Sequence, residues 1–175
     1  MKVSFITDIH GKTVTPEHLY DTDVLLIGGD ITQFGTYEKA KNVLKEVLNL
    51  NIKIFALRGN CDYEGVENFL IEKGIFGEGI NKHNDITFLG MGGANKTPFS
   101  TPYERNEEEI ENFLNSFSDL NDPFILFSHV PSYKTKLDKV GLMHTGSKAI
   151  RNFIKKKNPL IAFSGHIHQA KAKTI

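Results

Sequence analysis

The sequence has one cysteine, no surplus of charge of either sign and no long apolar run. A single cysteine, Cys61, excludes an intrachain disulfide framework and suits a reducing compartment. Lys plus Arg and Asp plus Glu each number 21, so the formal net charge of zero gives no electrostatic reason to expect a nucleic-acid partner. No run could span a membrane, and Asp8 and His10 interrupt the N-terminal one, so we expect a cytoplasmic protein without a signal peptide.

The chain length suits one domain, residues 1–175, with a single full-sized core. Short apolar runs recur along it, each with the length of a strand buried on both faces: 3–6, 24–27, 52–57, 86–89, 124–127 and 160–163. Segments with the apolar spacing of helices lie between them, at 36–50, 63–74, 106–117 and 146–158. This alternation predicts an α/β fold.

Polar side chains that can bind metal follow five of the predicted strands directly. In an open α/β sheet the carboxyl ends of the strands form the ligand-binding edge, so these side chains should converge. Carboxylate, amide and imidazole groups without thiolate favour Mn, Fe, Ni or Zn, and our first choice is Mn. We predict that one aspartate bridges two divalent ions. A hydroxide shared by the two ions would then attack phosphorus. The seven candidate ligands are Asp8, His10, Asp30, Asn60, His129, His166 and His168.

These motifs resemble the calcineurin-like metallophosphoesterase family over nearly the whole chain. The family pattern of D-x-H, G-D, G-N-H, H and G-H-x-H appears in order, as Asp8-Ile-His10, Gly29-Asp30, Gly59-Asn60-Cys61-Asp62, His129 and Gly165-His166-Ile-His168. The resemblance implies a sandwich of two β-sheets flanked by helices. It also implies that Asp30 bridges two metal ions, one held by Asp8, His10 and His168 and the other by Asn60, His129 and His166.

Cys61 stands where the family's common block has a histidine thought to protonate the leaving group. A thiol is usually neutral at pH 7 and is a poorer proton shuttle than histidine. The G-N-C-D variant resembles a branch of small prokaryotic members associated with phosphodiesterase activity, so we expect a small phosphodiester substrate. We assign catalytic roles to Asp30, Asn60, Cys61 and His129, and substrate contacts to Asn60, Arg58 and His144, although an ion pair in the sheet is at least as good an interpretation for Arg58.

Other activities stay open at this point. The same site would serve a nuclease, a phosphomonoesterase or nucleotidase, or a metal-binding scaffold with little activity. Specificity is expected to reside in the long irregular loops at 91–105 and 130–146. Family members continue through further strands after G-H-x-H, so the chain is either a C-terminal truncation or lacks its closing strands. We expect a weakened sheet edge, covered by a second copy in a homo-oligomer, and less firmly held His166 and His168.

Overall fold

The structure, a computed structural model, describes residues 1–170. Its α-helices are α1 (Tyr37–Leu44), α2 (Glu64–Glu72), α3 (Glu107–Asn115) and α4 (Lys148–Lys157). Its strands are β1 (Val3–Ile6), β2 (Val24–Ile27), β3 (Lys53–Ala56), β4 (Gly79–His83), β5 (Ile86–Met91), β6 (Ala94–Asn95), β7 (Glu104–Arg105), β8 (Phe124–Ser128), β9 (Lys139–Val140), β10 (Met143–His144) and β11 (Ile161–Ser164). Short 3-10 helices lie at Pro16–Leu19, Val47–Asn49 and His168–Ala170.

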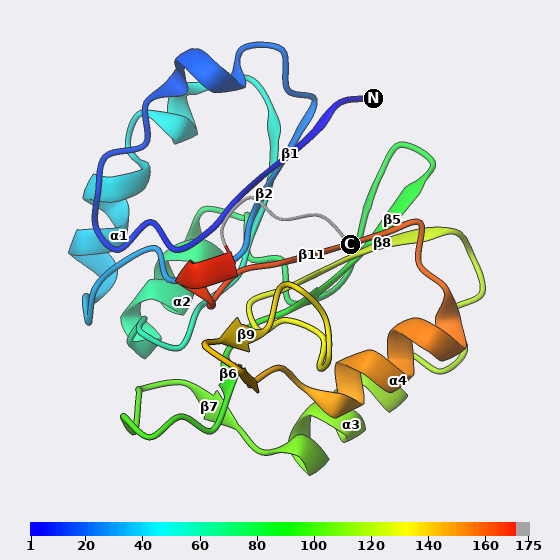
Figure 1. Ribbon diagram of the computed structural model, residues 1–175. Helices are drawn as coiled ribbons and strands as arrows, with labels where there is room; N and C mark the ends of the chain where they lie inside the picture. Colours follow the sequence, from blue (N-terminus) through cyan, green and yellow to red (C-terminus); the bar gives the residue numbers. More distant parts are fainter. Residues whose placement is uncertain (171–175) are drawn as a thin grey trace.

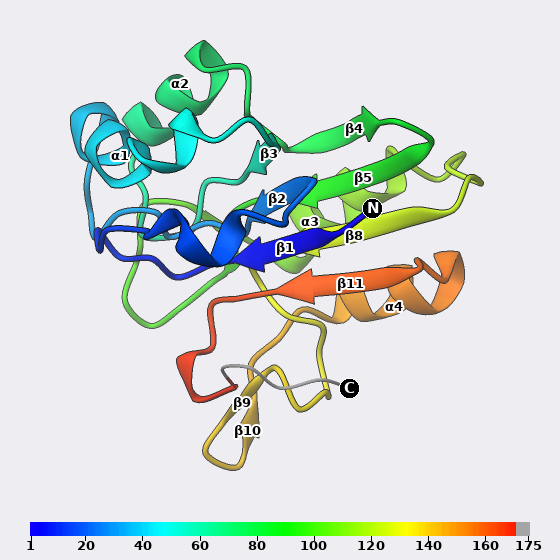
Figure 2. The same ribbon diagram turned by 90° about the horizontal axis from the view of Figure 1, so that it is seen from above.

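Two β-sheets face each other between two pairs of helices, which confirms the predicted sandwich (Figure 1). The first sheet is parallel, with the order β1-β2-β3. In the second, of order β11-β8-β5-β4, the first three strands are parallel and β4 is antiparallel to β5. The carboxyl ends of the parallel strands point toward the same side of the molecule, where their following loops meet (Figure 2).

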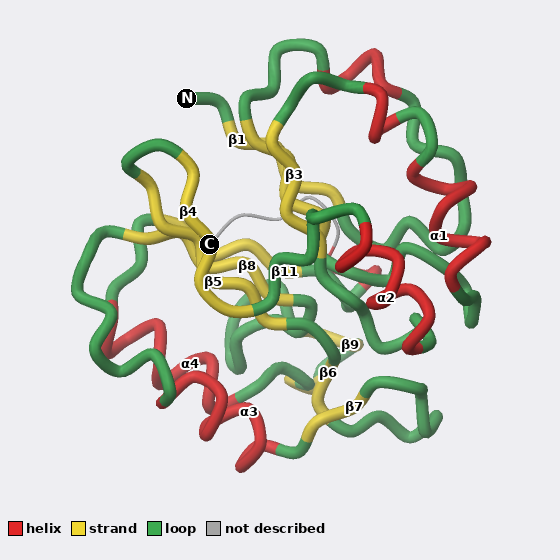
Figure 3. The backbone as a smooth tube through the Cα atoms, turned by 180° about the vertical axis from the view of Figure 1, so that it is seen from behind, coloured by secondary structure: helices red, strands yellow, loops and turns green. Residues whose placement is uncertain are grey.

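Alternation along the strands explains the layers. In β2, Leu26 faces the second sheet and packs in a cluster with Phe55, Phe88 and Phe127, whereas Leu25 faces the opposite way, toward α1 and α2. The central strands β2 and β8 are buried along their whole length because apolar residues cover both of their faces. Helices α3 and α4 pack on the outer face of the second sheet, so the helix pairs lie on opposite sides of the molecule (Figure 3).

Local sequence signals set the helix boundaries. Asn106 and Glu109 form a reciprocal capping box at the start of α3, and the Ser147 side chain caps α4 by accepting a hydrogen bond from the Ile150 N–H. Gly74 follows α2 with φ of 65°, as a glycine just past a helix end should. All four predicted helical segments are confirmed, but the segment at 36–50 breaks after Leu44 and resumes as a 3-10 turn.

The prediction that every apolar run is buried on both faces is wrong for two strands. β1 is only half-buried along its length, and β11 begins with exposed residues, Ile161 being 47% exposed. Both are edge strands of their sheets in the described part of the chain, so each lacks a neighbour on one side. The strand β4 was not predicted, because Gly79–His83 contains too few apolar residues to differ from a loop.

The edges of β1 and β11 run side by side (Figure 2). Side chains from both strands line a groove of about 590 Å³. Phe5 and Phe163 line it and stack with ring centroids 5.1 Å apart. The predicted weakness of this sheet edge depends on the chain after Ala170, and residues 171–175 lie outside the described residues. The described part shows that the sandwich is open on the side of β1 and β11.

The open side should matter less for stability than the middle of the sandwich. Phe127 is fully buried between the sheets, whereas Phe163 packs only partly against the same cluster. We expect Phe127→Ala to lower the free energy of unfolding by about 3–5 kcal/mol. The matched change Phe163→Ala should cost about half as much or less, because fewer neighbours surround the cavity it leaves. Urea denaturation of both variants tests this, and equal losses would contradict it.

Candidate metal centre

The candidate ligands converge because parallel strands end together. The loop after β1 carries Asp8 and His10, and it is hydrogen-bonded to the loop after β2: the Asp8 N–H donates to the Gly29 carbonyl at 3.1 Å, and the His10 N–H to the Asp30 carbonyl at 2.8 Å. The loop after β11 joins them, since the His166 N–H donates to both oxygens of the Asp8 carboxylate at 3.0 and 3.1 Å. Loops far apart in the sequence thus form one centre.

Several of these residues have an unusual backbone. Asp8, His10, Asp30 and His166 have positive φ values between 48° and 69°. Residues other than glycine rarely adopt this left-handed conformation, and it is maintained only where the surrounding structure requires it, often at functional sites. Here it turns the chain sharply at the strand end, so that neighbouring side chains point into the centre.

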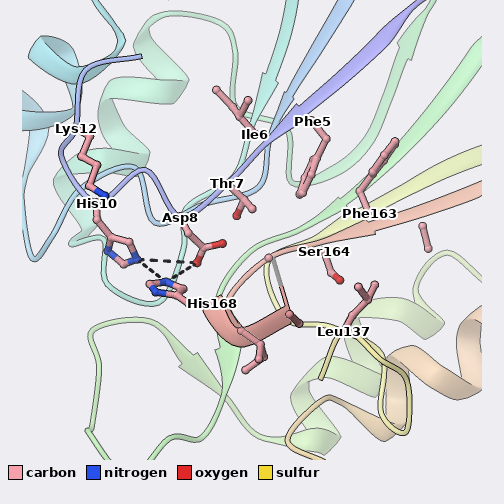
Figure 4. Close-up of a pocket in the computed structure, with 14 residues that line it drawn as sticks. Phe5, Ile6, Thr7, Asp8, His10, Lys12, Leu137, Phe163, Ser164 and His168 are labelled. Carbon is pink, nitrogen blue, oxygen red and sulfur yellow. Dashed lines mark hydrogen bonds and ion pairs between the residues drawn. The ribbon is translucent and has the colours of Figure 1, made fainter. Parts of the chain in front are cut away.

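The first group of donors lies at the outer side of the centre, where the close-up shows the His10 and His168 rings facing each other beside Asp8 (Figure 4). The Nε2 atoms of the two imidazoles are 3.0 Å apart. The nearer Asp8 oxygen is 3.4 Å from His168 Nε2 and 4.0 Å from His10 Nε2. Oδ2 of Asp30 lies 3.7 Å from His10 Nε2. This outer group therefore comprises Asp8, His10, His168 and one oxygen of Asp30.

The second group is buried. His129 Nε2 lies 2.8 Å from the amide oxygen of Asn60 and 3.5 Å from Oδ1 of Asp30. The His166 ring packs against the His129 ring with centroids 5.1 Å apart. His129, Asn60 and Asp30 are all less than 4% exposed. This inner group therefore uses the other oxygen of the Asp30 carboxylate.

The donor atoms fit cations. Nδ1 of His129 lies 2.8 Å from the Gly28 carbonyl, which can only accept a hydrogen bond, so Nδ1 carries the proton. In the neutral ring, Nε2 then presents a lone pair to the amide oxygen of Asn60, which is also only an acceptor. Either a proton on Nε2 or a bound metal cation satisfies both of these atoms. Imidazole and carboxylate donors near one point are typical of transition-metal sites.

The family-model comparison decides which family this site belongs to. The model of the calcineurin-like phosphoesterases matches residues 1–170. The chain belongs to this family. It is therefore a metallophosphoesterase, and members of the family generally bind divalent metals.

Relatives and solved structures agree with this assignment. An uncharacterised protein of Methanocaldococcus jannaschii is 40% identical over 98% of this chain and 82% of its own length. A probable cyclic nucleotide phosphodiesterase of Ruthia magnifica is 31% identical over 86% of this chain and 64% of its own, so the chain spans less than two thirds of that relative. A solved structure of a Thermus thermophilus protein shares the fold with a TM-score of 0.67 and 16% identity, covering 93% of this chain and 80% of that one.

Asp62 links two loops of the metallophosphoesterase centre through hydrogen bonds, a role that its sequence context did not predict. Its carboxylate is fully buried and accepts hydrogen bonds from the N–H groups of Ile31, Thr32 and Gly59 and from the Thr32 hydroxyl, at 2.7 to 3.1 Å. It thus ties the Asp30 loop to the Asn60 loop. The sequence feature that could have pointed to this role is the position of Asp62 at the end of the Gly59-Asn60-Cys61-Asp62 motif.

Gly59 allows these two loops to approach. A methyl group on Gly59 would lie 2.0 Å from the backbone nitrogen of Asp30 and 2.2 Å from its Oδ1. Such contacts are impossible without moving the backbone. The glycine before Asn60 is therefore required by packing, in addition to any role in a motif.

Cys61 lies at the edge of both donor groups. Its N–H donates to Oδ1 of Asp30 at 2.8 Å, and its thiol is within 4.8 Å of donor atoms of His10 and Asp30. Burial, followed by the negative charge of Asp30, raises the pKa of the Cys61 thiol to about 12. The thiol of the metal-free protein therefore keeps its proton at neutral pH.

The two other predicted substrate contacts have partners within the protein. Arg58 pairs with Glu67 at 3.6 Å, donates from Nε to the Asp62 carbonyl and stacks over the Tyr103 ring, so its ion pair is with helix α2 and not within the sheet. His144 Nδ1 lies 2.7 Å from the carboxylate of Asp138, a fully buried residue. A substrate contact for either side chain stays a prediction.

The two C-terminal histidines differ in their environment. The His168 side chain is 63% exposed, whereas His166 is mostly buried. Burial, followed by repulsion from His129, lowers the pKa of His166 to about 4. His166 is thus neutral at pH 7 and retains a lone pair for a metal.

This shift makes the metal-free protein sensitive to acid. In the unfolded chain His166 titrates near 6.5, so between about pH 6.5 and 4 the unfolded state binds more protons and stability falls as pH falls. The effect has an upper limit of about 3 kcal/mol. Denaturation of chelated protein at pH 7.5 and 4.5 measures it. We expect a smaller pH effect in His166→Gln and an unchanged one in His83→Gln, a histidine on β4; equal effects in both would contradict the assignment.

Proposed function

We propose that this metallophosphoesterase hydrolyses small phosphodiesters with two divalent metal ions. The observation that supports this most is the position of Asp30, whose Oδ2 faces the outer donor group while its Oδ1 faces the inner one. A carboxylate shared in this way is the arrangement expected for two ions about 3.5–4 Å apart. Phosphoester hydrolysis follows from the family, and the pair of ions and the diester preference are our inference.

One ion would be held by Asp8, His10 and His168. The other would be held by Asn60, His129 and His166, and Asp30 would bind both ions. Bound divalent ions supply Lewis-acid activation of water and charge stabilisation at the phosphoryl oxygens. The protein contributes rigidity: the Gly28 carbonyl fixes the tautomer of His129, and Asp62 fixes the loop that carries Asp30. We favour Mn, with Fe, Ni or Zn as alternatives.

The neutral Cys61 thiol bears on which leaving groups the enzyme can expel. A group with a pKa near 12 is a poor proton donor to a departing alkoxide at pH 7. Esters whose leaving groups depart without protonation should suffer least. The Ruthia magnifica relative is named a probable cyclic nucleotide phosphodiesterase, so cyclic nucleotides are the first natural diesters to test.

Substrate class can be tested directly. Chelated protein should cleave neither bis(p-nitrophenyl) phosphate nor p-nitrophenyl phosphate. After addition of Mn²⁺ we expect cleavage of both, with the diester preferred. Faster cleavage of the monoester would favour the phosphomonoesterase alternative, cleavage of DNA or RNA alone a nuclease, and a full complement of metal without cleavage a binding scaffold.

Asp30→Asn tests the shared carboxylate. The change is nearly isosteric but leaves only one oxygen, so one donor group loses its Asp30 ligand. We expect at least about a hundredfold lower kcat and less than two tightly bound Mn²⁺ per chain, measured by elemental analysis after gel filtration. Asp85→Asn is the matched control, since Asp85 is exposed at the turn between β4 and β5. Two tightly bound ions in Asp30→Asn would refute the bridge.

Cys61→His tests the proton-donor argument. An imidazole can protonate a leaving group near neutral pH, so turnover of a monoester with a poor leaving group, such as phenyl phosphate, should rise about tenfold or more. Cys61→Ser, which has no group that titrates near pH 7, should not show the gain. If Cys61→His binds its full metal complement and turns over phenyl phosphate no faster, proton donation does not limit this enzyme.

A further inference from the structure

The side chain of Asn60 has a second partner, on the opposite end of its amide from His129. Its Nδ2 donates to the hydroxyl of Thr101 at 3.0 Å. Thr101 lies in the loop between β6 and β7. In the same loop, the Tyr103 N–H donates a hydrogen bond to the Asn60 carbonyl at 3.2 Å. The loop therefore contacts a candidate metal ligand through both its backbone and a side chain.

Glu104 organises this loop. A single carboxylate oxygen, Oε1, accepts hydrogen bonds from the hydroxyl of Thr97 at 2.6 Å, from the Thr101 N–H at 2.8 Å and from the Thr101 hydroxyl at 2.7 Å. Burial alone would raise the pKa of Glu104, but the hydrogen bonds from Thr97 and Thr101 outweigh it and lower the pKa to about 2. Glu104 is thus an ionised acceptor at neutral pH.

These contacts have a fixed direction. A carboxylate only accepts, so the one hydroxyl proton of Thr101 points toward Glu104. The Thr101 oxygen can then only accept in its contact with Asn60, so the amide is the donor there. Only the NH2 end of the amide can provide one, and the amide oxygen must point the other way, toward His129 Nε2 at 2.8 Å.

We propose that Thr101 is a positioning residue that orients the Asn60 amide so that its oxygen faces the metal centre. This inference rests on the proposed function, in which Asn60 Oδ1 is a metal ligand. An asparagine amide has two ends of nearly equal size, and the reversed orientation would present N–H groups, which cannot bind a cation. The Cys61 sulfur, 3.5 Å from Nδ2, favours the same orientation but is a weak acceptor.

Thr101→Val removes the hydroxyl and keeps the shape of the side chain. We expect about tenfold weaker binding of the Mn²⁺ ion that Asn60, His129 and His166 would hold, measured by titration calorimetry on the chelated protein, because partners of metal ligands usually affect affinity by about 10- to 100-fold. Thr101→Ser keeps the hydroxyl and should restore affinity.

Thr97→Val is the matched control. Thr97 makes the same kind of hydrogen bond to Glu104 from the same loop, and among its described contacts none is to Asn60. If Thr101 merely stabilises the loop, both valine variants should weaken Mn²⁺ binding alike. The positioning role predicts a loss in Thr101→Val alone, and equal losses would overturn it.

Asn60→Asp separates orientation from contact. Both oxygens of a carboxylate can bind metal, so no orientation has to be chosen. Thr101→Val should then cost much less in the Asn60→Asp background than in the native one, and the same loss in both would overturn the proposal. The native protein is titrated first: if it takes up no Mn²⁺, the proposed function fails, whereas two ions bound with equal affinity by the native protein and Thr101→Val would refute only the positioning role.

Discussion

The Asp30 carboxylate is the group on which the whole centre depends. It is almost fully buried, and its two oxygens face different sets of nitrogen and oxygen donors. A buried carboxylate is stable only when it is paired or hydrogen-bonded, and the Cys61 N–H supplies one such bond. The surrounding loops are arranged to keep it there: Asp62 ties its loop to the next one, and Gly59 leaves room for its backbone.

The centre is buried on one side and open to solvent on the other. Its inner group comes from the loops after β2, β3 and β8, and the side chains of Asp30, Asn60 and His129 are shielded from solvent. Its outer group includes His168, which sits at the mouth of the groove between β1 and β11 (Figure 4). The two donor groups therefore differ in solvent access, and the outer one is less constrained by packing.

Much of the fold could be predicted, because apolar runs of strand length and apolar stripes of helical spacing are local patterns. The six runs became strands and the four striped segments became helices. The predictions failed where burial depended on distant neighbours: nothing in Val3–Ile6 or Ile161–Ser164 distinguishes an edge strand from a central one. The strand Gly79–His83 forms only because β5 offers it an edge to pair with.

The sequence by itself determined which chemical groups are available, because the order Asp, His, Asp, Asn, His, His, His at strand ends is a property of the chain alone. The family resemblance implied how these groups divide between two ions, whereas only the tertiary structure decided their spacing and orientation. That division follows from which strands lie side by side, and the orientation from partners such as Thr101 and Asp62, which the fold brings into contact with the donor loops. Hydrogen bonds between residues 30 or more positions apart leave no local pattern in a single sequence, so the donors could be named from it and the contacts that orient them could not.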